Sequence, residues 1–65
     1  MNYTTEQRDK LTRFAQLIAN SGDDIENDVI SATDEDDLMA LLAHIDIMRR
    51  NLEQLKDSVR SVLES

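Results

Sequence analysis

Eight carboxylate side chains fall within residues 23–37, a stretch that reads DDIENDVISATDEDD. They are Asp23, Asp24, Glu26, Asp28, Asp34, Glu35, Asp36 and Asp37. Carboxylates at this density suit three roles: they can bind a metal, imitate the phosphates of a nucleic acid, or stabilise the first turns of helices.

The spacing of these carboxylates does not fit a calcium loop of the EF-hand type. Such a loop needs alternating ligands, a Gly at the sixth position and a Glu at the twelfth. Counted from Asp24, the twelfth residue is Glu35, but the sixth is Val29. No metal and no cofactor is therefore predicted.

Catalytic and nucleic-acid-binding residues are also scarce. His44 is the only imidazole and the chain has no Cys, so no nucleophile and base are expected to converge, and we predict no catalytic residues and no enzyme. Acidic residues interleave with the basic residues of the C-terminal half, and no aromatic platform accompanies them, so direct nucleic-acid binding is not expected. Those basic residues are Arg49, Arg50, Lys56 and Arg60.

The charge imbalance is concentrated in one place. The net charge is −7, yet residues outside 23–37 contain seven Lys or Arg and only six Asp or Glu. A localised negative field can steer a basic partner towards the protein. We therefore consider all eight carboxylates of residues 23–37 a candidate contact for a basic protein, beside the simpler interpretation that they cap helices and confer solubility.

The N-terminal region has the pattern of a helix over residues 5–20. Thr4 and Gln7 have the spacing of a capping box, and an apolar face then recurs every three or four residues. Its members are Leu11, Phe14, Ala15 and Ile18. The sequence Asn20-Ser21-Gly22 predicts the end of this helix, with Gly22 in a left-handed conformation.

Two further helices are expected. Ile25, Val29 and Ile30 indicate a short helix over 24–31, capped by Asp23 or Asp24. Thr33 then fits the N-cap of a long helix over 34–63, whose first turn is acidic as the helix dipole favours.

The long helix carries apolar residues in a strict 3-4 spacing over four heptads. The a positions are Leu38, Ile45, Leu52 and Val59, and the d positions are Leu41, Met48, Leu55 and Val62. This stripe predicts a coiled-coil-like seam for self-association, with His44 at its partly exposed flank. The g positions carry little charge to pair with the e positions, which favours folding of the first helix back onto the long one. The sequence leaves open whether two copies pair in parallel or antiparallel fashion.

Length and composition lead to the same fold class. Sixty-five residues with one Gly and no Pro indicate few, long elements in a single helical domain, 1–65. So short a chain without disulfides usually needs a partner to complete its core. We expect an all-α helical hairpin that associates into a bundle as a homodimer or larger assembly. The N-terminus has no signal-peptide pattern and no apolar run reaches membrane length, so a cytoplasmic protein without membrane contact is predicted.

These features favour a non-enzymatic, acidic regulator or adaptor that binds itself and another protein. A basic surface on that other protein would complement the acidic residues 23–37. Two alternatives stay open. The chain could compete with nucleic acid for a basic groove, or it could be a purely structural coiled-coil component.

Overall fold

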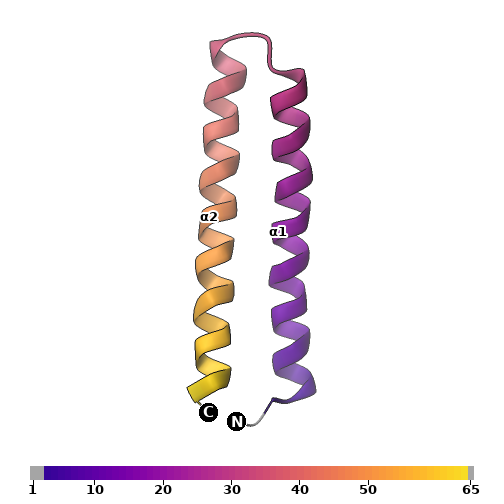
Figure 1. Cartoon of the computed structure of the whole chain (residues 1–65), viewed down its shortest axis with the longest axis vertical. Helices are drawn as coiled ribbons and strands as arrows, with labels where there is room; N and C mark the ends of the chain where they lie inside the picture. Colours follow the sequence, from indigo (N-terminus) through magenta and orange to yellow (C-terminus); the bar gives the residue numbers. More distant parts are fainter. Residues whose placement is uncertain (1–2, 65) are drawn as a thin grey trace.

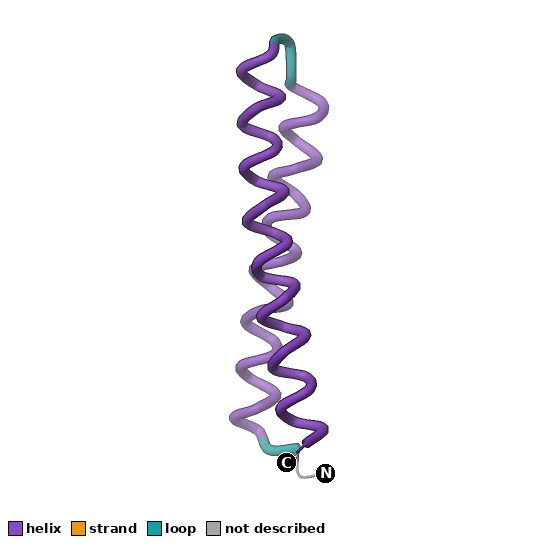
Figure 2. The backbone as a smooth tube through the Cα atoms, turned by 90° about the vertical axis from the view of Figure 1, so that its left-hand side faces the viewer, coloured by secondary structure: helices purple, strands orange, loops and turns teal. Residues whose placement is uncertain are grey.

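The computed structural model describes residues 3–64 and consists of two antiparallel helices, α1 (Thr5–Ser31) and α2 (Glu35–Glu64). Residues 32–34 connect them, and the helices run side by side for almost their whole length (Figure 1). In the perpendicular view they overlap, so the molecule is one layer of two helices (Figure 2). The Cα positions extend over 49 × 15 × 10 Å. The predicted all-α helical hairpin is confirmed.

The start of α1 agrees with the sequence pattern. Thr4 is the N-cap: its Oγ1 accepts a hydrogen bond from the Gln7 amide at 3.2 Å. The Thr4 amide in turn donates to Oε1 of Gln7 at 2.8 Å. This reciprocal capping box satisfies two amide donors that the first helical turn cannot pair internally.

The predicted break at Gly22 is wrong, and so is a separate short helix over 24–31. Gly22 lies inside α1, and no residue of the described range 3–64 has a positive φ. A glycine within a helix costs about 1 kcal/mol relative to alanine. Ending the helix there would remove Ile25 and Asp28 from the contact with α2, so packing of the amphipathic face outweighs the local preference. Neither Asp23 nor Asp24 caps a helix.

The start of α2 is shifted by one residue from the prediction. Asp34, not Thr33, accepts the hydrogen bond from the amide of Asp37, at 2.9 Å. Asp37 reaches back and accepts from the backbone amide and the hydroxyl of Thr33, at 3.0 and 3.2 Å. Asp is as good an N-cap as Thr or better, which explains the displacement. The predicted bounds 34–63 otherwise agree with Glu35–Glu64 within a residue.

The contact between the helices, which we call the seam, mixes apolar and polar side chains. On α1 the partly buried side chains recur at 3-4 spacing: Gln7, Leu11, Phe14, Ile18, Ser21, Ile25 and Asp28. On α2 they are Leu41, His44, Met48, Asn51, Leu55 and Ser58, followed by Val62. Within residues 3–64, Val62 alone is buried. The hairpin therefore has very little core of its own.

Only one of the two rows of the heptad stripe of α2 lies in the seam. The d residues Leu41, Met48, Leu55 and Val62 pack in the seam with α1. The a residues Leu38, Ile45, Leu52 and Val59 stay between 39% and 54% exposed. A coiled coil between copies, and the self-association that the stripe predicts, stay predictions.

Candidate interaction surfaces

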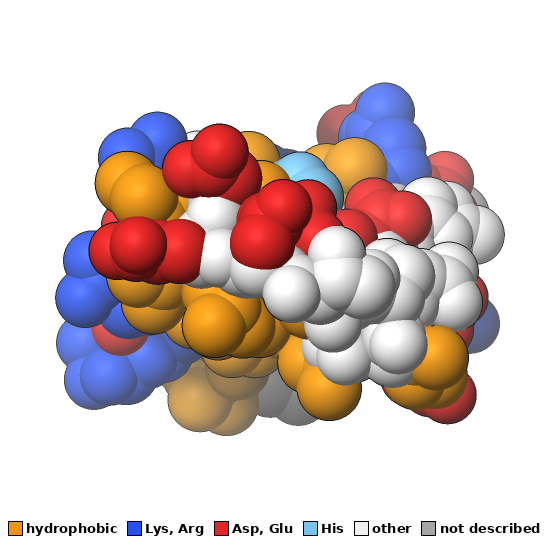
Figure 3. Space-filling view, turned by 90° about the horizontal axis from the view of Figure 1, so that it is seen from above, with side chains coloured by type: hydrophobic (Ala, Val, Ile, Leu, Met, Phe, Trp, Pro, Cys, Tyr) orange, Lys and Arg blue, Asp and Glu red, His pale blue; other side chains and the backbone are white. Residues whose placement is uncertain are grey.

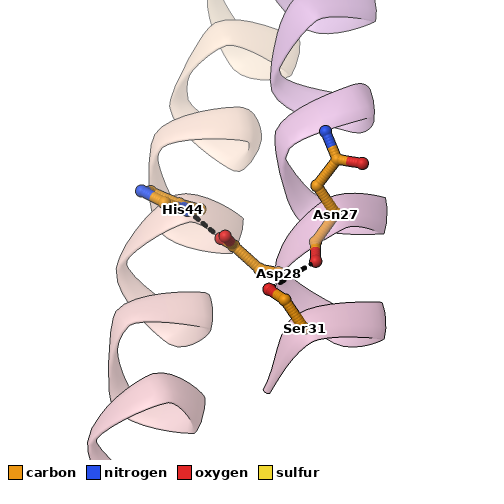
Figure 4. A network of polar contacts seen from close by, with 4 residues as sticks. All are labelled: Asn27, Asp28, Ser31 and His44. Carbon is orange, nitrogen blue, oxygen red and sulfur yellow. Dashed lines mark hydrogen bonds and ion pairs between the residues drawn. The ribbon is translucent and has the colours of Figure 1, made fainter.

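One polar contact joins the two helices near the loop. The Asp28 carboxylate of α1 and Nδ1 of His44 on α2 form a hydrogen-bonded ion pair when the imidazole is protonated (Figure 4). The side chains are 29% and 42% exposed, respectively. One turn further along α1, the Ser31 hydroxyl donates to the carbonyl of Asn27 at 2.8 Å. His44 thus positions the helices, in agreement with its expected place at the flank of the stripe.

Three of the eight carboxylates in residues 23–37 have a clear role in the fold. Asp28 contacts His44, Asp34 caps α2, and Asp37 binds Thr33. The backbone amide of Thr33, followed by its hydroxyl, lowers the pKa of Asp37 from its usual 3.8. These three side chains stabilise the hairpin itself, so their presence does not require a partner.

The other five carboxylates make no side-chain hydrogen bond or ion pair with the described residues, and three of them have no role in their fold. No side-chain hydrogen bond or ion pair within residues 3–64 involves Asp23, Asp24, Glu26, Glu35 or Asp36. Glu35 and Asp36 lie in the first turn of α2, where the helix dipole favours negative charge. Asp23, Asp24 and Glu26 lie towards the C-terminal end of α1, where no helix start needs them and the dipole does not favour them. The helix cap expected at Asp23 or Asp24 therefore does not account for their charge.

A second surface is apolar. Among the exposed large hydrophobic side chains of α2, six aliphatic ones recur at spacings of three, four and seven, which places them along one side of the helix. We call them the outer face: Leu38, Leu42, Ile45, Leu52, Val59 and Leu63. Seen from the loop end, hydrophobic side chains line the side of the molecule opposite the histidine (Figure 3).

The outer face continues onto α1. On the side of the hairpin away from the outer face, shallow hollows between the helices bring Asp24 of α1 beside Ile47 of α2, and Lys10 beside Ser61. The side of α1 that faces away from Lys10 and Asp24 therefore lies beside the outer face. That side carries Ala15, Gly22 and Val29, each seven residues from the next. Two of these three residues are small, so the row of large side chains on α2 lies beside a row of smaller side chains on α1.

The described residues 3–64 contain no group of three His, Cys, Asp or Glu side chains arranged to hold a metal ion. In the same range, neither helix combines the length and apolar composition needed to cross a bilayer. The two surfaces, acidic and apolar, are therefore the features that call for a functional explanation.

Comparison with models of known protein families, with curated proteins and with solved structures finds no match. Function is accordingly inferred from the two surfaces alone.

The continuity of α1 across Gly22, and with it the seam residues Ser21, Ile25 and Asp28, was missed by sequence reasoning. One signal was available, because the 3-4 spacing of Leu11, Phe14 and Ile18 continues through Ser21, Ile25 and Asp28. The pattern is not evident as an apolar one, because Ser21 and Asp28 are polar. Extending it would have predicted one uninterrupted helix over this region.

Proposed function

We propose that this protein is a non-enzymatic interaction module, a small regulator or adaptor that self-associates through α2 and acts by binding another protein. The observation that carries the proposal is the outer face, where six large aliphatic side chains are at least 39% exposed, while Val62 alone is buried among residues 3–64. Contiguous exposed apolar patches on small proteins mark sites of association. Lack of Cys agrees with a reducing cytoplasmic setting, which forms part of the proposal.

Paired variants of α2 test the self-association. Leu52 and Ile47 are 47% and 48% exposed, but Ile47 lies beside the hollow on the opposite side of the molecule. We expect Leu52→Asn to shift the protein towards a 7.4 kDa species in sedimentation equilibrium, and Ile47→Asn to leave the assembly intact. A wild-type protein that sediments as a monomer at tens of micromolar contradicts the proposal.

A second binding surface is proposed at the loop end, residues 23–37. Asp23, Asp24 and Glu26 stabilise neither helix, which favours a role in contacting a basic protein. The test replaces these three residues by Asn, Asn and Gln and compares partner capture from the native host with that of the unchanged protein. A matched control neutralises three carboxylates elsewhere, Asp9, Glu53 and Asp57. Equal capture by both variants refutes the contact.

The two alternatives have separate signatures. A competitor for a nucleic-acid-binding groove would be displaced from its partner by DNA, and its binding would weaken steeply with salt. A purely structural component would lose assembly and activity together in Leu52→Asp and tolerate charge reversal throughout residues 23–37. The regulator or adaptor function is favoured because it explains both the outer face and the surplus carboxylates.

A further inference from the structure

We propose that two copies of this chain pack outer face against outer face with their loops at opposite ends, forming an antiparallel four-helix bundle of twofold symmetry. This inference rests on the proposed self-association and adds to it the occupant of the outer face and the orientation of the two copies.

The exposed surface area of the hairpin is large enough for a partner molecule of its own size to cover the outer face. The hairpin exposes 5126 Å², whereas a compact monomer of 7.4 kDa exposes about 4,200 Å². The hairpin thus carries roughly 900 Å² more than a protein of its mass normally leaves in water. A standard specific interface removes about 800 Å² from each partner. One partner molecule, packed along the outer face, brings the exposed area to the ordinary value.

The apolar character of the face favours a second copy of the same chain. A twofold interface brings one surface against itself. With the loops at opposite ends, the twofold axis runs perpendicular to the helices, so the α2 row of each copy packs along the α2 row of the other in the reverse direction, and α1 packs along α1. Each exposed aliphatic row then covers the other and is removed from water.

The distribution of charge selects the orientation. All eight carboxylates of residues 23–37 lie at the loop end, where no Lys or Arg occurs, and the rest of the chain carries one net positive charge. If both loops lay at the same end, two sets of eight carboxylates would lie about one helix diameter apart, roughly 10 Å, close to the screening length of about 8 Å at physiological salt. With loops at opposite ends, the sets are separated by most of the 49 Å length of the hairpin. Repulsion between them is then screened almost completely.

Charges along the rim of the outer face agree with this orientation. Near the loop end the rim carries Glu26, four residues beyond Gly22. Near the other end it carries Arg8, seven residues before Ala15. The antiparallel arrangement brings the acidic rim of one copy towards the basic rim of the other. The parallel arrangement brings like charges together at both ends.

Distance measurements between spin labels test the orientation directly. The chain has no Cys, so Ile30→Cys near the loop and Ser61→Cys near the opposite end each provide a single labelling site on an exposed residue. In each labelled protein alone, we expect a separation of most of the 49 Å length. In a mixture of the two, a new population should appear at about 20–25 Å, roughly two helix diameters.

The same samples test the orientation, the face and the self-association separately. Long distances in the single-label samples and a short one in the mixture support the proposal, and Leu52→Asn introduced into both labelled chains should abolish all of these distances. A dimer with short distances in the single-label samples overturns the orientation but leaves self-association standing. A dimer that survives Leu52→Asn overturns the assigned face. Labelled chains that sediment only as monomers overturn the proposed self-association itself.

Discussion

Gly22 offers the sharpest test of the continuous helix α1. In this structure Gly22 is a helix-interior residue, and a Cβ placed on it meets as its nearest neighbour the Cε atom of Met48, at 3.9 Å. That distance is an ordinary van der Waals contact, so an alanine fits without displacing its surroundings. Alanine is favoured over glycine in helix interiors by about 0.8–1.0 kcal/mol. We therefore expect Gly22→Ala to stabilise the protein by about 1 kcal/mol per chain.

The assay is thermal unfolding followed by circular dichroism at a fixed protein concentration, because association makes the midpoint depend on concentration. A gain of about 1 kcal/mol should raise the midpoint by about 4–8 °C for a domain of this size. Ala43→Gly is the matched control, since Ala43 is exposed, lies in the interior of α2 and belongs to neither row of the heptad stripe. It should lower the midpoint by a similar amount.

A glycine that ends a helix in the left-handed conformation behaves in the opposite way. Alanine at such a position destabilises, because its Cβ is strained at positive φ. A lower melting temperature in Gly22→Ala, together with reduced helicity, would refute the continuous α1 and restore the break expected from the sequence.

Three further predictions concern hydrogen bonds at the helix ends and in the seam. The pKa of Asp37 is lowered in the folded state, so its stabilising effect is present above the unfolded-state pKa of 3.8 and is lost as the pH falls through the folded-state pKa. In Asp37→Asn, the free energy of unfolding measured with urea should therefore fall less steeply between about pH 5 and pH 3 than in the unchanged protein. Thr4→Ala should cost about 1 kcal/mol through loss of the capping box, whereas Thr5→Ala, one residue inside the helix, should change stability by less than about 0.5 kcal/mol, both measured by urea unfolding. A double-mutant cycle of Asp28→Ala and His44→Ala at neutral pH should give a coupling energy of about 0.5–1.5 kcal/mol, and additive single effects would show that their contact does not stabilise the hairpin.

The parts of the fold that the sequence predicted depend on strong local signals. The capping box at Thr4 and Gln7 and the unbroken stripe of α2 each contain enough information in a few neighbouring residues to define a helix. Gly22 misled the prediction because its local preference opposes packing against α2, including Met48, which is distant in the sequence. In the structure, Ile18 and Ile25 face the same seam on either side of Gly22.

The candidate surfaces could be predicted only in part. The identity of the acidic residues is evident in the sequence, but their roles depend on where α1 ends. A helix ending near residue 20 would make Asp23 or Asp24 a cap, whereas a helix ending at Ser31 leaves both as surplus charge. The outer face presents a similar ambiguity. Both rows of the heptad stripe are equally apolar, and the sequence of α2 alone does not indicate which row faces α1.

The polar contact between Asp28 and His44 also has a consequence for the alignment of the two helices. The seam residues of α2 repeat every seven positions, so sliding α2 by one heptad would exchange Leu41 for Met48 at little cost in apolar packing. The same slip would place Asn51 or Asp37 opposite Asp28 in place of His44. A carboxylate against a carboxylate is repulsive, and an amide has no positive charge to offer. One polar pair, together with the short connection at residues 32–34, thus specifies a single register in a hairpin whose apolar contacts would accept several.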